Sequence, residues 1–94
     1  MSSLEKIIQI ERTIGIYNNS DDEVVEEVVI SIPVETLREI VTPNEDDPDL
    51  YEGYVLTEEQ LEKLNALLEK KITPDFSTFY YVLEATGIYD WSAN

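Results

Sequence analysis

The sequence predicts an α+β fold, with a four-stranded antiparallel sheet and two helices packed on one of its faces. Three observations support this prediction. Apolar residues occupy alternate positions over 8–16, and β-branched residues dominate 24–32, as in half-buried strands. Leucines recur at helical spacing over 61–68. A chain of 94 residues suits a single core, so we predict one domain over 1–94, in the order strand, strand, helix, strand, helix, strand.

The first two strands are predicted to form a hairpin. The apolar positions of the first strand are Ile8, Ile10, Ile14 and Ile16. Arg12 lies on the same side, where we expect its stem to pack while the guanidinium reaches an edge or a carboxylate. Residues 18–22, NNSDD, are typical of a turn, because short polar side chains bond to nearby backbone. A second strand over 24–32 then runs antiparallel to the first.

A short helix, a loop and a third strand are predicted next. In PVETLREIV three apolar residues fall at helical spacing, and Pro33 suits the first turn of a helix. We expect this helix to end at Thr42-Pro43. The prolines and acids of 43–53 are typical of a surface loop, and YEGYVL then forms a short strand.

The second helix is predicted to begin at Thr57, because TEEQ has the form of a capping box, in which Thr and Gln satisfy free backbone donors. Its apolar stripe is predicted to contain Leu61, Leu64, Leu67 and Leu68. Lys70 and Lys71 suit the negative end of the helix dipole. The last strand is predicted from Phe76 to Ala85, where aromatic and β-branched residues dominate.

The charge of the chain excludes several kinds of partner. The formal net charge is -15, and fifteen of the 21 acids lie between Asp21 and Glu62 with a single cation, Arg38. A field of this sign repels phosphate, so we expect no binding to nucleic acid or to an anionic membrane. The N-terminus has no basic segment before an apolar run, and no stretch has the length of a membrane span. We therefore expect a cytoplasmic protein.

The composition also argues against catalysis. The chain has no His and no Cys, which removes the commonest nucleophile and base pairs and structural zinc. With 21 acids some carboxylates always lie close together, so proximity alone does not indicate a hydrolase. A twelve-residue calcium register starting at Asp47 fails, because Glu52 replaces the required Gly. We predict no enzyme, no catalytic residue, no cofactor and no metal site.

The acidic residues instead predict a binding surface for a cationic protein. Solubility needs a net charge of only about 2–8 in a small domain, and further acids add repulsion, whereas they do accelerate association with a basic protein. Tyr and Trp, including Trp91 in the tail, add the aromatic part of such a surface. We expect Phe76, Phe79 and Tyr81 in the core. The predicted partner-binding residues are Asp21, Asp22, Glu23, Glu26, Glu27, Asp47, Asp49, Tyr51, Glu52, Tyr54 and Tyr80.

Four segments carry a resemblance to a known family. The segments IGIYNNSDDEVVEEV, DDPDLYEGYVLTEEQ, LNALLEKKITPDF and FYYVLEATG match in order and spacing, over about Ile8 to Trp91. In these the chain resembles the cloacin and colicin ribonuclease immunity proteins, and similar small acidic proteins accompany toxins of contact-dependent inhibition systems. The resemblance implies a four-stranded antiparallel sheet, no enzymatic activity, and tight binding to the basic nuclease domain of a cognate toxin. We expect a monomer or weak dimer when free.

The resemblance places the binding surface around the acids of the predicted hairpin, residues 21–27, with the acids and tyrosines of 47–54 beside them. Inhibition at the active site or at an adjacent exosite remains open. Two other functions explain the same acidity. A nucleic-acid mimic would disarm a DNA-binding protein, and an acidic scaffold subunit would use its charged face for assembly.

Overall fold

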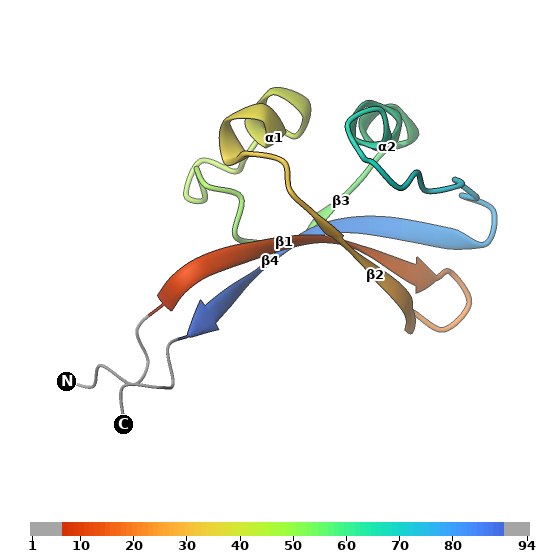
Figure 1. Ribbon diagram of the computed structural model, residues 1–94. Helices are drawn as coiled ribbons and strands as arrows, with labels where there is room; N and C mark the ends of the chain where they lie inside the picture. The colour runs from red at the N-terminus through yellow and green to blue at the C-terminus, as the bar shows by residue number, and fades with distance from the viewer. Residues whose placement is uncertain (1–6, 90–94) are drawn as a thin grey trace.

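The computed structural model of the chain describes residues 7–89, and within these the side chains of 10–87. It contains the predicted α+β fold in the predicted order, with a four-stranded antiparallel sheet and two helices side by side on one face (Figure 1). The strands are β1 (Ile7–Asn18), β2 (Val24–Ile30), β3 (Tyr54–Val55) and β4 (Phe79–Tyr89), and the helices are α1 (Val34–Ile40) and α2 (Glu58–Asn65). Trp91 lies outside the described residues.

The sheet order is β2-β1-β4-β3, so the two long strands lie in the centre. β1 pairs with β2 from Arg12 opposite Ile30 to Tyr17 opposite Val24, with an irregularity after Ile16. The predicted hairpin is therefore confirmed. Among residues 7–89, β2 and β3 form the two edges of the sheet, and β3 pairs with the middle of β4.

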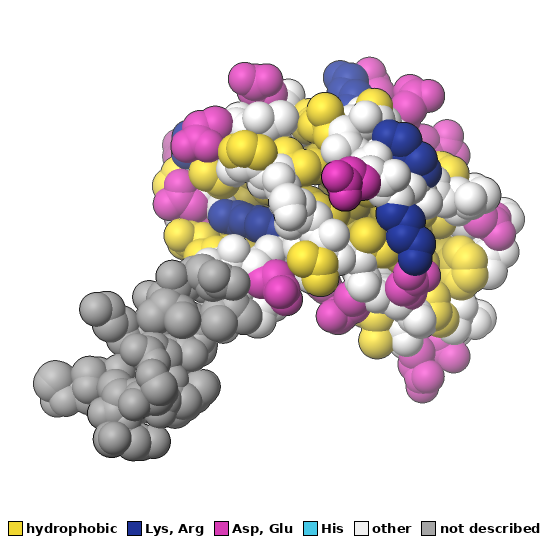
Figure 2. Space-filling view, viewed as in Figure 1, with side chains coloured by type: hydrophobic (Ala, Val, Ile, Leu, Met, Phe, Trp, Pro, Cys, Tyr) yellow, Lys and Arg dark blue, Asp and Glu magenta, His cyan; other side chains and the backbone are white. Residues whose placement is uncertain are grey.

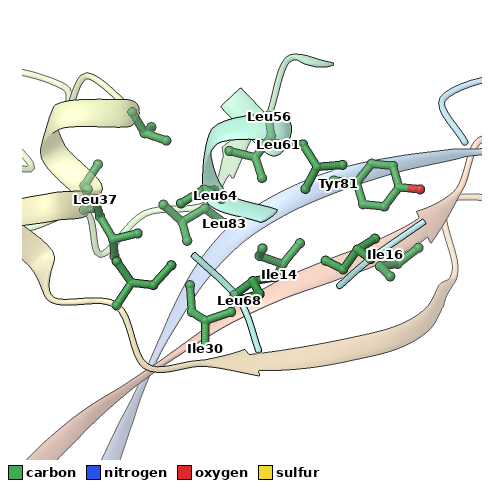
Figure 3. Packing of buried hydrophobic residues seen from close by; sticks show 14 residues of the cluster. Ile14, Ile16, Ile30, Leu37, Leu56, Leu61, Leu64, Leu68, Tyr81 and Leu83 are labelled. Carbon is green, nitrogen blue, oxygen red and sulfur yellow. The ribbon is translucent and has the colours of Figure 1, made fainter. Parts of the chain in front are cut away.

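The core lies between the sheet and the two helices. Its fully buried members come from the sheet and from both helices, as Figure 3 shows for Ile14, Leu37, Leu61, Leu64 and Leu83. Leu50, in the loop before β3, is fully buried as well. Tyr81 is buried as predicted, and its hydroxyl accepts a hydrogen bond from the backbone N–H of Asp75 at 2.9 Å. Phe76 and Phe79 are partly buried and pack against this cluster. The last strand begins at Phe79, so the predicted start at Phe76 was wrong. A turn over 76–78 precedes it.

The predicted cap of α2 is confirmed. The N–H of Gln60 donates to the Thr57 hydroxyl at 3.1 Å, and the Thr57 N–H donates to the Gln60 side chain at 2.9 Å. In α1, by contrast, Pro33 is the residue before the helix, with extended backbone, and not part of its first turn. No helix within 7–89 is long and apolar enough to cross a membrane.

α2 ends earlier than its leucine stripe predicts. The Asn65 side chain exchanges two hydrogen bonds of 2.8 Å with the backbone of Ile72, which turns the chain away from the helix axis. Leu67 is therefore 52% exposed and lies off the stripe, whereas Leu68 is buried. The Lys71 ammonium donates to the carbonyls of Asn65 and Leu68, at 2.9 and 2.6 Å, which fits the predicted cation at this helix end.

Candidate functional site

The predicted acids of the hairpin are held by a well-bonded turn. We call Asp21, Asp22, Glu23, Glu26 and Glu27 the hairpin acids. The turn closes through hydrogen bonds of 2.9 Å from Asn18 N–H to Glu23 C=O and from Asp22 N–H to Asn18 C=O. Asp22 adopts left-handed backbone with φ 61°. Asn19 binds the turn to the 76–78 segment through its backbone and side chain. The hairpin acids thus extend from a fixed backbone.

All five hairpin acids are exposed, and none forms an ion pair with another of the described side chains. The two ion pairs within the described side chains, 10–87, join Arg38 to Asp49 at 3.5 Å and Lys63 to Glu59 at 3.7 Å. Figure 2 shows acidic side chains distributed over the whole visible face, with fewer basic ones among them. Within the described part of the chain, no cation therefore lies at ion-pair distance from a hairpin acid, although Lys70 and Lys71 line the same hollow as Glu26 and Glu27.

Two stacked tyrosines lie beside the hairpin acids. The rings of Tyr17 and Tyr80 have centroids 5.3 Å apart and planes 14° apart. The Tyr17 hydroxyl donates a short hydrogen bond to Glu84. That bond, then burial, and then the charges of Glu84 and Glu27 raise the pKa of Tyr17 to about 12. Burial and a hydrogen bond to Asp22 raise the pKa of Tyr80 above its ordinary value. Tyr80, one of the predicted binding residues, thus lies beside the hairpin acids.

The second predicted set of acids and tyrosines, in 47–54, forms a different structure. Asp47 is only 5% exposed, which does not fit the binding surface to which it was assigned from the sequence. Its two oxygens accept hydrogen bonds from Tyr51 N–H, Glu52 N–H and the Tyr54 hydroxyl, at 2.9, 2.9 and 2.7 Å. Although burial raises the pKa of Asp47, these hydrogen bonds outweigh it and hold the pKa below its usual range.

Arg12 joins this loop to the sheet. Its guanidinium donates to the backbone carbonyls of Leu50 and Asp49, at 2.5 and 2.8 Å, and lies 5.4 Å from the centre of the Tyr51 ring. The packed stem and reaching head match the prediction, but the head finds backbone carbonyls and not a carboxylate. Tyr51 remains 53% exposed beside it. Arg12 therefore holds the loop in place.

The two predicted sets do not form one surface, which corrects the prediction that they lie side by side. The loop of 47–54 contacts β1 at Arg12, whereas the hairpin turn follows Asn18. This stretch of extended strand spans about 20 Å. Figure 1 places the loop beside α1 at the left and the turn between β1 and β2 at the far right. Asp49, Tyr51, Glu52 and Tyr54 therefore lie apart from the hairpin acids.

A family model described as a domain of unknown function (DUF7683) matches residues 11–84. The chain belongs to this family. No curated protein matches the chain, and no solved structure does. The DUF7683 match includes both helices, the paired part of the hairpin and the Tyr17 and Tyr80 stack, but not the outer ends of β1 and β4. The site therefore lies within the family's domain.

Within this DUF7683 domain, sequence reasoning missed two members of the site. Tyr17 and Glu84 lie on the face of the sheet opposite the helices, and Glu84 is separated from Tyr17 by 67 residues. The sequence did contain an indication of where the Tyr17 ring lies. Gly15 precedes Tyr17 by two positions on the same face of the strand, and its missing side chain leaves room for the ring. We define the hairpin surface as the five hairpin acids together with Tyr17, Tyr80 and Glu84.

Replacing Gly15 by alanine is expected to displace Tyr17 from Glu84. The new Cβ would lie 2.7 Å from the Tyr17 ring and 2.8 Å from a Glu84 oxygen. Alanine reduces the conformational freedom of the unfolded chain, which would stabilise the fold by about 0.4–1 kcal/mol. Overpacking at this position costs about 1–3 kcal/mol, so we expect a net loss of stability. We expect the Tyr17 pKa to fall from about 12 toward the ordinary value, as measured by ultraviolet titration.

The matched control for this variant is Gly53→Ala. There the new Cβ meets its nearest atom, Val82 Cγ1, at 3.4 Å, which is an ordinary contact. We expect a change in stability within about 0.5 kcal/mol and no change in the Tyr17 titration. A Tyr17 pKa that stays near 12 in Gly15→Ala would contradict the role given to the Glu84 hydrogen bond.

Proposed function

We propose that this DUF7683 domain is a non-enzymatic inhibitor that binds a basic protein through the hairpin surface. The observation that supports this most directly is a set of five exposed carboxylates on the hairpin turn and the adjoining β2, beside two stacked tyrosines. None of the five forms an ion pair with another described side chain. Like charges on a strand pair repel, so the arrangement costs stability in the isolated domain. A cationic partner would remove that cost, and it would also associate faster because of the field.

We propose further that the partner is the nuclease domain of a bacterial toxin, and that the chain is its immunity protein. The class of partner comes from the resemblance to the cloacin and colicin ribonuclease immunity proteins. The hairpin acids would occupy the cationic groups that the nuclease uses on phosphate. A nuclease depends on such groups to bind its substrate. Tyr17 and Tyr80 would supply the aromatic contact area that is typical of interface centres.

The experiment compares two double variants that remove the same charge. Glu26→Gln with Glu27→Gln removes two hairpin acids, whereas Glu39→Gln with Glu45→Gln removes two exposed acids on α1 and the loop after it. The partner to be used is a basic nuclease domain, to be sought in the reading frame directly upstream. Stopped-flow mixing at low and high salt measures the association rate, and a thermal melt of each free variant measures stability.

We expect the hairpin pair to slow association at low salt by about tenfold, while its melting temperature stays equal or rises. The control pair should change the rate by much less, because its charges lie farther from the contact. An association rate that does not depend on salt, or an equal effect of both pairs, would refute the proposal.

A further inference from the structure

The outer edge of β2 is unpaired within 7–89. The sheet order places β2 at one end, and its only strand partner is β1. In an antiparallel edge strand, every second residue directs its backbone N–H and C=O away from the neighbouring strand. An edge of seven residues, Val24–Ile30, is long enough to accept a further strand.

The side chains of this edge form an unusual pattern. Residues 24–29 read VVEEVV, and Val24, Val25 and Val29 are 48%, 50% and 61% exposed. The register places Glu26 opposite Ile16, on the helix side of the sheet, and Glu27 opposite Gly15, on the other side. Each face of the edge thus presents one carboxylate next to β-branched side chains.

A groove follows the same strand on the helix side. Two adjoining hollows of about 620 and 430 Å³ share Val28, Val29 and Lys70, and they lie between β2 and the segment after α2. The apolar lining of the larger hollow comes from Ile16, Val28, Ile72, Phe79 and Tyr81. Its charged lining consists of Glu26, Glu27, Lys70 and Lys71. The Lys71 ammonium is already hydrogen-bonded to the carbonyls of Asn65 and Leu68, so it points to the end of α2. Side chains of a strand added to β2 would therefore find an apolar floor.

The charges decide what fits this edge. A second copy would bring another net charge of -15 and could place Glu26 and Glu27 near the same residues of its own β2. Like charges directly opposite each other in a sheet are destabilising, whereas opposite charges contribute about 0.2–1 kcal/mol per pair. Successive residues of a strand point to opposite faces, so two consecutive cations on an added strand would meet Glu27 and Glu26 in turn. The edge therefore fits a basic strand.

We propose that β2 receives an extended segment of the basic partner as a fifth strand of the sheet. Two consecutive Lys or Arg residues of that segment face Glu26 and Glu27, and apolar residues on either side of them pack on the flanking valines and in the groove. Main-chain hydrogen bonds supply affinity in such strand addition, and side chains supply specificity. The inference rests on the proposed function for the identity of the partner, and adds the element that the partner contacts.

The test is amide hydrogen exchange on the complex with the upstream nuclease domain. We expect the outward N–H groups of Val24–Ile30 to exchange at least about tenfold more slowly in the complex than in the free domain, because they become hydrogen-bonded. Binding without protection of these groups would overturn strand addition and leave the proposed function standing. If the nuclease does not bind at all, the proposed function fails, and strand addition is then decided by peptides.

The peptide probe carries two consecutive lysines between pairs of valines. Its control is the same peptide with methyl groups on the backbone nitrogens that face β2, which keeps the charge and removes the hydrogen bonds. We expect the parent peptide to protect the β2 amides and the methylated one to bind at least about tenfold more weakly. Equal binding of the two peptides, or no binding of either, would overturn strand addition. The acids would then serve only to keep the edge of β2 from pairing with other strands.

Discussion

Replacing Leu64 by alanine is expected to lower the free energy of unfolding by about 2–5 kcal/mol. Leu64 is fully buried in α2, where it belongs to the cluster between the helices and the sheet. Alanine removes the side-chain contacts and leaves a cavity that the sheet beneath cannot fill without distortion. Chemical denaturation followed by circular dichroism measures this change.

Leu67→Ala is the matched control, because the sequence predicts both leucines on one stripe. Leu67 lies beyond the end of α2 and is 52% exposed, so its truncation is expected to change stability by less than about 0.5 kcal/mol. Equal effects of the two substitutions would mean that the helix continues past Asn65 and that Leu67 packs in the core.

Replacing Asp47 by asparagine is expected to lower the melting temperature by roughly 5–15 °C at neutral pH. The carboxylate accepts three hydrogen bonds, from Tyr51 N–H, Glu52 N–H and the Tyr54 hydroxyl. All three partners are donors, and the asparagine amide replaces one acceptor oxygen by an NH₂ group that is itself a donor. At least one of the three partners is then left without an acceptor. Asp46→Asn, at the exposed neighbouring position, is expected to have little effect.

The same aspartate predicts an acid dependence of stability. The folded state holds the pKa of Asp47 below its usual range, so its contribution is present above the unfolded value and is lost as the pH falls through the folded value. The difference in melting temperature between the wild type and Asp47→Asn should therefore shrink below about pH 4. A difference that stays constant from neutral pH to strong acid would contradict the bonding of this carboxylate.

The fold class could be predicted because its signals are local. The alternation of isoleucines in β1 and the capping box at Thr57 each depend on residues a few positions apart, and both predictions were confirmed. The ends of helices and strands were harder to predict, because they depend on residues that are distant in the sequence. α2 ends where Asn65 bonds to Ile72, and β4 begins after a turn that Asn19 holds from the other end of the chain.

In the candidate site, too, the features that depend on local sequence could be predicted and those that depend on distant contacts could not. The exposure of Asp21 and Asp22 follows from turn formers in the same segment, and that of Glu26 and Glu27 from charged residues on the second strand of a hairpin, so both could be predicted from the sequence. The burial of Asp47 could not, because it depends on a loop that Arg12 attaches to the sheet from 38 residues away. The separation of the two acidic sets likewise depends on the position of that loop relative to β1.

The central pairing of β1 with β4 has a consequence for how the protein is made. Tyr17 and Glu84, which bond across these strands, are 67 residues apart, so the middle of the sheet closes only after nearly all of the domain has left the ribosome. Until then both long edges of the nascent hairpin are open. Mutual repulsion between the carboxylates of neighbouring nascent chains would keep those edges apart during translation.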